Sequence, residues 1–300
     1  MRYRIFIFLL FSFLLPSHIV SSDYQEISTT HFDFYFSKHD KKVAEHLARE
    51  ADMIAEKVRA DLGVSFKGKI KVHIAQENEF ETIQPHHATI PDWVSGVAYH
   101  KLSLIILKSP RAVRGTHYDL RKTFIHEISH VLLGSGFRNG ERIPRWLNEG
   151  IAMYESREWS FTRVSTITQA VLTDSLLPLP EITHRFPRTR REAELAYCQS
   201  FYLISFLITN YGKEKFHHFI RYYSRERMLE DTLLKVYGMN VRQLERKWHS
   251  YLKMRFSWIP LITSTSTLWF IITLIFICSY IRKKRKASMT LQQWEKEELP

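Results

Sequence analysis

Cysteine, glycine and proline are scarce in this chain of 300 residues. It has two cysteines, ten glycines and ten prolines, which excludes a disulfide-stapled, collagenous or low-complexity protein. Cys198 lies in the body of the chain and Cys278 in an apolar run near its end, so we expect no bond between them. Residues 23–257 contain no Asn-x-Ser/Thr acceptor site, which favours a bacterial envelope over a glycosylating secretory pathway.

Acidic residues are also scarce: the chain has 31 Asp and Glu against 43 Lys and Arg, which gives a formal net charge of +12. Six of the basic and three of the acidic residues lie in 282–300, and two arginines lie in 1–4. Residues 5–281 therefore keep 35 basic and 28 acidic residues, a net charge of +7. No motif of basic and aromatic residues accompanies this excess, so we predict no nucleic-acid partner.

Two apolar segments predict how the chain meets a membrane, and the first is at the N-terminus. Met1–Arg4 is basic, Ile5–Leu15 is apolar apart from one serine, and Val20-Ser21-Ser22 offers small residues for cleavage. The apolar run is too short to cross a bilayer. Residues 1–22 are therefore predicted to be a secretory signal peptide, with an uncleaved signal anchor as the alternative.

The second apolar segment, Trp258–Ile281, has 24 residues without a charge, and five consecutive basic residues, Arg282–Lys286, follow it. This pattern predicts a transmembrane helix over residues 258–281 in contact with membrane lipid, and a buried core helix is the alternative. The positive-inside rule then makes residues 282–300 a cytoplasmic tail and places residues 23–257 outside the cytoplasm, in the periplasm or on the cell surface.

The body of the chain, residues 23–257, changes from strands mixed with helices to helices alone. Periodicity and breakers predict the first elements: strands at 31–36 and 70–74, two strands within 94–107, and helices at 41–62 and 77–83. A helix capped by Thr116 and ended by Gly134 and Gly136 comes next. Further helices are predicted at 145–157, 191–211, 213–223, 229–237 and 241–255. This order predicts an α+β fold.

The most informative motif is His126-Glu127-Ile128-Ser129-His130. Residues four apart lie on one face of a helix, so both imidazoles can point at one metal ion. Glu127 is then next to the metal without binding it, where a carboxylate can accept a proton from water. An ordinary amphipathic helix with solvated histidines is the alternative, because the motif also arises by chance.

Glu149 supplies a third candidate ligand, with 18 residues between it and His130. Pro144 opens its helix, and the intervening glycines let the chain reverse, so the two helices can face each other. Two histidines and one carboxylate, with an open fourth position, are typical of a catalytic zinc site. The sequence therefore predicts one Zn²⁺ per chain.

These motifs, together with Trp146-Leu147-Asn148-Glu149-Gly150-Ile151-Ala152, resemble those of the gluzincin metallopeptidases, including the membrane alanyl aminopeptidase type. Residues 27–255 look like the bacterial peptidase MA-like domain, and three short later segments, at 196–200, 210–213 and 237–239, are similar too. The resemblance implies a zincin-like fold, zinc held by His126, His130 and Glu149, and Glu127 as general base. It also implies a tyrosine that hydrogen-bonds the oxyanion of the tetrahedral intermediate. We expect Tyr197 in this role, with Tyr202 as the second candidate.

One departure from the family pattern bears on specificity. The aminopeptidases carry a Gly-x-Met-Glu-Asn strand whose glutamate holds the free amine of the substrate, whereas the matching stretch here, Ser95–His100, has no carboxylate. An endopeptidase is therefore favoured over an aminopeptidase. The strand Leu102–Leu107 is expected to bind an extended peptide by edge pairing.

The predicted function is hydrolysis of peptide bonds in peptide or protein substrates by a membrane-anchored zinc enzyme. The predicted helix 241–255 ends only a few residues before the predicted span, which suggests substrates in the envelope or tethered to the membrane. Two alternatives are a catalytically silent zinc-binding scaffold or sensor, and a zinc hydrolase of a non-peptide bond.

Overall fold

The computed structural model describes residues 24–85, 94–113, 118–137, 143–158, 160–187, 189–226, 228–258 and 265–297. The N-terminal part forms a five-stranded sheet in the order β1-β2-β3-β5-β4. Its three central strands are parallel, namely β2 (Phe32–Ser37), β3 (Ile70–Ala75) and β5 (Leu104–Lys108). The edge strands β1 (Tyr24–Ser28) and β4 (Gly96–Tyr99) are antiparallel to their neighbours. The sheet is therefore mixed.

One face of the sheet packs against α1 (Lys41–Leu62), whose buried residues recur every three or four positions, as in an amphipathic helix. Gly63 ends this helix in the left-handed conformation, at φ +66°, which glycine adopts without steric cost. Phe32 and Phe34 of β2 are fully buried, and the ring of Phe32 lies 5.3 Å from that of Phe124 in α3 (Leu120–Ser135). The core of the sheet thus continues into the helix that carries the histidine motif.

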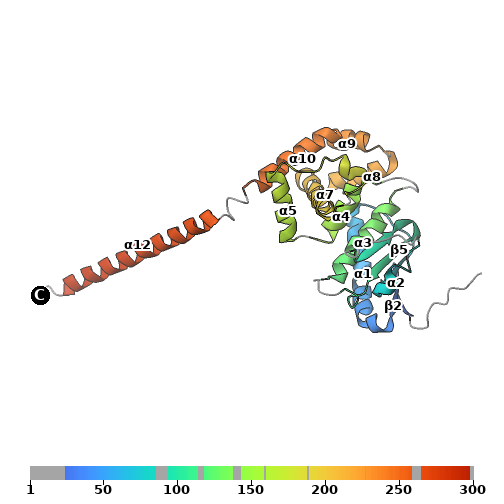
Figure 1. Ribbon diagram of the computed structural model, residues 1–300, viewed down its shortest axis with the longest axis horizontal. Coiled ribbons are helices and arrows are strands. Elements are labelled where there is room, and N and C mark those ends of the chain that lie inside the picture. The colour runs from blue at the N-terminus through green and yellow to red at the C-terminus, as the bar shows by residue number, and fades with distance from the viewer. Residues whose placement is uncertain are drawn as a thin grey trace, which may run out of the picture.

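The rest of the described body is helical (Figure 1), and its helices follow α2 (Glu77–Phe80) and α3 in chain order. They are α4 (Arg145–Glu155), α5 (Phe161–Leu172), α6 (Glu181–His184), α7 (Arg190–Tyr211), α8 (Lys213–Glu226), α9 (Leu229–Tyr237) and α10 (Val241–Phe256). The helices α4 and α7 pack closely at Gly150, where a Cβ atom would lie 2.5 Å from the carbonyl oxygen of Ser200. The candidate site lies where α4 meets α3.

The predicted α+β organisation is confirmed, and the predicted strands and long helices recur with small shifts in their bounds. Three elements were not predicted: β1, α5 and α6. The sequence of α5 is rich in Ser, Thr and Val, which have low helix propensity, but its Ile167, Ala170 and Val171 are buried. Thr116 lies outside the described residues, and α3 is capped by Asp119, whose side chain accepts a hydrogen bond from the Lys122 amide at 3.1 Å.

The two predicted membrane segments fall at the ends of the chain. Residues 1–22 lie outside the described residues. The C-terminal helix α12 (Thr265–Glu297) extends away from the other helices (Figure 1), and its side chains are exposed from Leu268 to Met289. Over the part of the chain that the structure describes, no helix has the length and apolar character needed to cross a membrane. The transmembrane helix stays a prediction.

Candidate metal centre

Helix α3 directs two imidazole rings toward one point. The helix is held in the core by Phe124, Ile128 and Val131, which are fully buried. His126 and His130 lie one turn apart on the side that faces α4, and their ring centroids are 4.9 Å apart with an interplanar angle of 79°. The spacing of four residues therefore places both rings on one face, as the sequence predicted.

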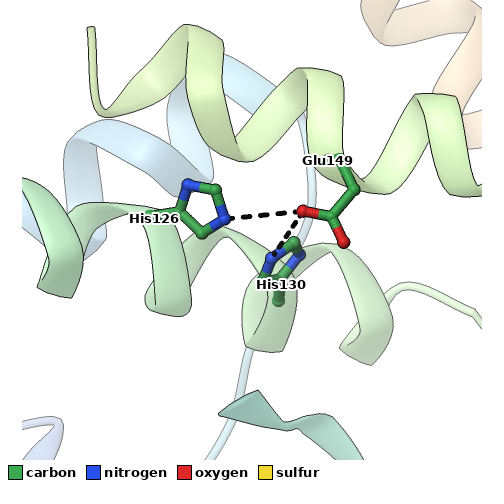
Figure 2. Close-up of side chains that lie close together, drawn as sticks. All are labelled: His126, His130 and Glu149. Carbon is green, nitrogen blue, oxygen red and sulfur yellow. Dashed lines mark ion pairs between the residues drawn. The ribbon is translucent and has the colours of Figure 1, made fainter. Parts of the chain in front are cut away.

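Glu149 reaches the same point from α4 (Figure 2). Its Oε2 atom lies 3.6 Å from Nε2 of His126 and 3.6 Å from Nε2 of His130. The three potential ligand atoms lie within 4.8 Å of one another. Around a tetrahedral zinc ion with bonds of ~2.0–2.1 Å, neighbouring ligands are about 3.4 Å apart. The residues present therefore fit a zinc ion in donor type and in spacing.

The other nitrogen of each imidazole is held by a hydrogen bond. Nδ1 of His126 donates to Oε1 of Glu158 at 2.7 Å, and Nδ1 of His130 donates to Oδ1 of Asn148 at 3.0 Å. A neutral imidazole with its proton on Nδ1 keeps the lone pair of Nε2 available for a metal ion. Such outer hydrogen bonds select the tautomer and the ring orientation that a metal ligand needs.

Glu158 is itself held by a polar network. Its carboxylate accepts hydrogen bonds from the Ser156 hydroxyl and from the Arg163 guanidinium, both at 3.1 Å. Arg163 also donates to Glu194 of α7 at 3.2 Å. The sequence did not predict this network, because Glu158 lies after the end of α4 and Arg163 lies in the first turn of α5, a helix that was not predicted. Asn148 lies in the motif that contains Glu149, and its position directly before this ligand was the signal that could have identified it.

The carboxyl groups of the site have displaced pKa values. Burial alone would raise the pKa of Glu149, but His130, His126 and Arg145 outweigh it and lower this pKa to about 2. Burial of Glu158 is likewise outweighed by His126 and Arg163, which lower its pKa to about 2. Both groups are thus ionised at neutral pH, the form in which a carboxylate binds a cation.

Glu127 is buried on the side of α3 that faces β4. Burial, together with repulsion from Glu149 and Glu158, raises its pKa to about 7, although His126 acts in the opposite direction. A Cβ atom at Gly96 of β4 would lie 2.8 Å from Oε1 of Glu127. Only glycine therefore leaves room for the Glu127 carboxyl at this point. A group with a pKa near 7 is well matched to proton transfer at neutral pH.

These residues line one cleft of about 850 Å³. One wall is formed by α3 and α4, with His126, Glu127, His130 and Glu149. The facing wall includes Ser95–Ala98 at β4. The described parts of α7 contribute Tyr197 and Glu194. The arrangement brings a candidate metal site and a buried carboxyl group together in a space large enough for a peptide segment.

Comparison with known proteins identifies the family. The sequence matches the profile of the Peptidase MA superfamily over residues 50–254. The chain belongs to the Peptidase MA superfamily. The resemblance predicted from the motifs is thereby confirmed. No curated protein matches the sequence.

Solved structures similar to this Peptidase MA chain include a hydrolase and a zinc metallopeptidase. Leukotriene A4 hydrolase from Saccharomyces cerevisiae is 18% identical with a TM-score of 0.44, and the match covers 72% of this chain and 36% of the hydrolase. The M1 zinc metallopeptidase from Deinococcus radiodurans is 15% identical with a TM-score of 0.42, and the match covers 75% of this chain and 50% of the peptidase. The chain thus spans half or less of these proteins.

The structure places the two candidate tyrosines of this Peptidase MA chain differently. Tyr197 lines the cleft, and burial raises the pKa of its hydroxyl to about 12. Tyr202 is 5% exposed, packs edge-on against Phe201 and Phe256, and is not among the described residues that line the cleft. Tyr197 therefore stays the candidate for the oxyanion, and Tyr202 is a core residue.

The predicted edge pairing of Leu102–Leu107 is wrong. Its residues 104–107 lie in β5, which has β3 on one side and β4 on the other, so their backbone groups are already paired. The edge strand next to the cleft is β4. The strand order was not predictable from the sequence, because the hairpin of β4 and β5 can add to the sheet by either strand.

Proposed function

We propose that this protein is a zinc-dependent metallopeptidase. The observation that carries the proposal is the convergence of His126, His130 and Glu149 on one point, with the buried Glu127 beside them in a cleft. Membership of the Peptidase MA superfamily supports the same activity. A zinc ion bound by these three residues would polarise the scissile carbonyl and make water nucleophilic at neutral pH.

Other residues of the cleft would transfer the proton, stabilise the oxyanion and orient the metal ligands. Glu127 accepts a proton from the attacking water and passes it to the leaving amine, and its buried position excludes competing solvent. Tyr197 donates a hydrogen bond to the oxyanion of the tetrahedral intermediate. The network of Glu158 and Arg163 and the amide of Asn148 keep the two imidazoles oriented.

We propose internal peptide bonds as the substrate. The stretch Ser95–His100, which lines the cleft at β4, has no carboxylate to hold a free amine. Tyr99 stands at the position of the glutamate in the Gly-x-Met-Glu-Asn pattern. Its hydroxyl donates to Gln84 at 3.1 Å, and it is not among the described residues that line the cleft. An extended peptide can add to the outer edge of β4, which pairs with no strand among the residues that the structure describes.

We also propose that residues 258–281 anchor the enzyme in a membrane with residues 23–257 outside the cytoplasm. The uncharged run and the basic stretch after it support this topology. Substrates would then be envelope or membrane-tethered proteins. Extraction of the membrane fraction with carbonate tests the anchor, and release of the full chain into the supernatant would contradict it.

The first experiment combines metal analysis of the full chain with cleavage of a diverse peptide library. We expect about one zinc per chain and cleavage at internal bonds. Glu127→Gln should keep the zinc and lower the rate by about 10³-fold or more, because only the proton acceptor is lost. Glu81→Gln, which changes an exposed glutamate, is the matched control and should keep full activity.

Each other result has a definite meaning. Full activity of Glu127→Gln would contradict the assigned role of Glu127. Zinc without cleavage of any peptide would favour the scaffold or sensor. Cleavage of esters or other non-peptide substrates alone would favour the second alternative. A protein that binds no zinc would refute the proposal as a whole.

A further inference from the structure

Arg145 lies beside the candidate metal centre and has no role in the proposed chemistry. It is the first residue of α4, one turn before Glu149. Its Nη2 atom lies 3.0 Å from Oε1 of Glu149 in an ion pair, whereas the other oxygen of Glu149 faces the two histidines. The guanidinium is therefore separated from the metal position by a single carboxylate group.

The side chain of Arg145 is both held in place and accessible. Its guanidinium lies over the ring of Phe186, 5.4 Å from the ring centroid, and close to the hydroxyl of Tyr197, whose pKa it acts to lower against the effect of burial. Phe186 also packs edge-on against Tyr197, at 5.0 Å between centroids. Despite these contacts, 47% of the Arg145 side chain is exposed, against 7% for Glu149. The guanidinium thus presents a fixed face to the cleft.

The charges around Arg145 differ from those around Arg163, a second arginine of the cleft. Arg163 lies between Glu158 and Glu194, so its charge is compensated twice. Among the residues that the structure describes, Arg145 is paired with Glu149 alone, and a metal ion bound to Glu149 would compensate the same negative charge, so that the charge of Arg145 would be less well compensated. Three arginines and four glutamates are among the described residues that line the cleft. The formal charge of these seven side chains is −1, and a divalent cation bound among them would change the total to +1.

We infer that Arg145 binds a carboxylate of the substrate next to the scissile bond, so that the enzyme prefers peptides with an acidic side chain or a free C-terminal carboxylate at that position. A guanidinium has five N–H donors in a planar fork that matches a carboxylate, and its contacts with Glu149 and Tyr197 leave donors for a ligand. The inference rests on the proposed peptidase function and adds a substrate class to it.

The test measures binding rather than turnover. Zinc-loaded Glu127→Gln protein is titrated by calorimetry with peptides of one sequence, in which a single Glu or Gln replaces each position in turn. A second pair ends in a free carboxylate or in an amide. We expect one carboxylate, internal or terminal, to bind about 10- to 100-fold more tightly than its neutral counterpart. The position of this effect separates the two sources of the carboxylate.

Variants assign the preference to Arg145. Adding Arg145→Gln should bring the ratio of the two dissociation constants to about 1, and Arg145→Lys should give an intermediate ratio, because it keeps the charge and loses the fork. Arg185→Gln, at an exposed position outside the cleft lining, should keep the full ratio. Zinc content is measured for every variant. If Arg145 only supports Glu149, Arg145→Gln will weaken zinc or all peptides equally and leave the ratio unchanged, which overturns the inference.

The outcomes also separate this inference from the proposed function. Cleavage by the wild-type protein without any preference for a carboxylate overturns the inference and leaves the peptidase in place. A carboxylate preference in binding, without cleavage of any peptide by the wild type, refutes the peptidase and leaves the role of Arg145. Failure of every peptide to bind overturns the inference.

Discussion

Glu149 in the metal centre and Glu155 at the far end of α4 are buried to a similar extent but have very different pKa values. In the metal centre, Glu149 and Glu158 both have a pKa of about 2. In the junction of α1, α4 and α8, which consists of Lys57, Asp61, Glu155 and Lys213, the pKa of Glu155 is about 7. Glu149 is 5% exposed and Glu155 is 8% exposed, so burial raises the pKa of both. Burial alone does not distinguish the site from the junction.

The positions of the cations explain the difference. In the centre, each carboxylate has a histidine and an arginine within contact distance. In the junction, Lys57 lies 2.9 Å from Asp61 but 3.7 Å from Glu155, and Lys213 also pairs with Asp61. Glu155 is left facing the negative charge of Asp61. The centre thus keeps two carboxylates ionised, which suits the binding of a cation, whereas the junction leaves the carboxyl of Glu155 partly protonated at neutral pH.

Removal of a metal ligand should have the largest effect. His130→Ala should lower the zinc content from about one per chain to below about 0.1 and abolish hydrolysis, because two protein ligands do not retain the ion. Zinc at about 100 times its dissociation constant should stabilise the wild type by about 2.7 kcal/mol and leave the variant unchanged. Thermal unfolding with and without zinc measures this, and His39→Ala, an exposed histidine, is the control. An equal response of both variants to zinc would contradict the assignment.

The outer hydrogen bonds should have an intermediate effect that differs between the two histidines. Glu158→Ala removes a charged acceptor from His126 and should weaken zinc binding about 10- to 100-fold. Asn148→Ala removes a neutral acceptor from His130 and should weaken it about 2- to 10-fold. Competition with a chromogenic chelator measures both affinities. Glu158→Gln keeps the acceptor oxygen and removes the charge, so a result close to that of the wild type would show that the hydrogen bond alone matters.

The metal ligands were predictable from the sequence because their geometry is local. His126 and His130 are related by the period of one helix, and Glu149 lies in a second helix whose start is marked by Pro144. The core periodicity of α1 also gave its bounds without error. Each of these features depends on a few neighbouring residues.

The contacts that were missed depend on tertiary structure. Glu158 reaches His126 only because the chain turns after α4, and Arg163 joins it from α5, whose β-branched residues do not favour a helix. Gly96 lies against Glu127 because β4 pairs with β5 at the edge of the sheet. Nothing in the local sequence specifies which of these two strands forms that edge. Side chains that come together from separate elements leave no periodic signal.

The smallest effect is expected in the junction, where Glu155→Gln should stabilise the protein at high pH. Burial and Asp61 raise the pKa of Glu155 from its ordinary value of 4.5 to about 7. The unfolded chain therefore releases this proton first, and wild-type stability is lost as the pH rises from 4.5 through 7. Gln cannot ionise, so the variant should be about 1–3 kcal/mol more stable at pH 8 and nearly equal to the wild type at pH 4.5. Urea unfolding at both pH values measures the difference. Glu45→Gln, on the exposed side of α1, should show no such change with pH, and a gain of equal size at both values would mean that packing rather than ionisation of Glu155 is responsible.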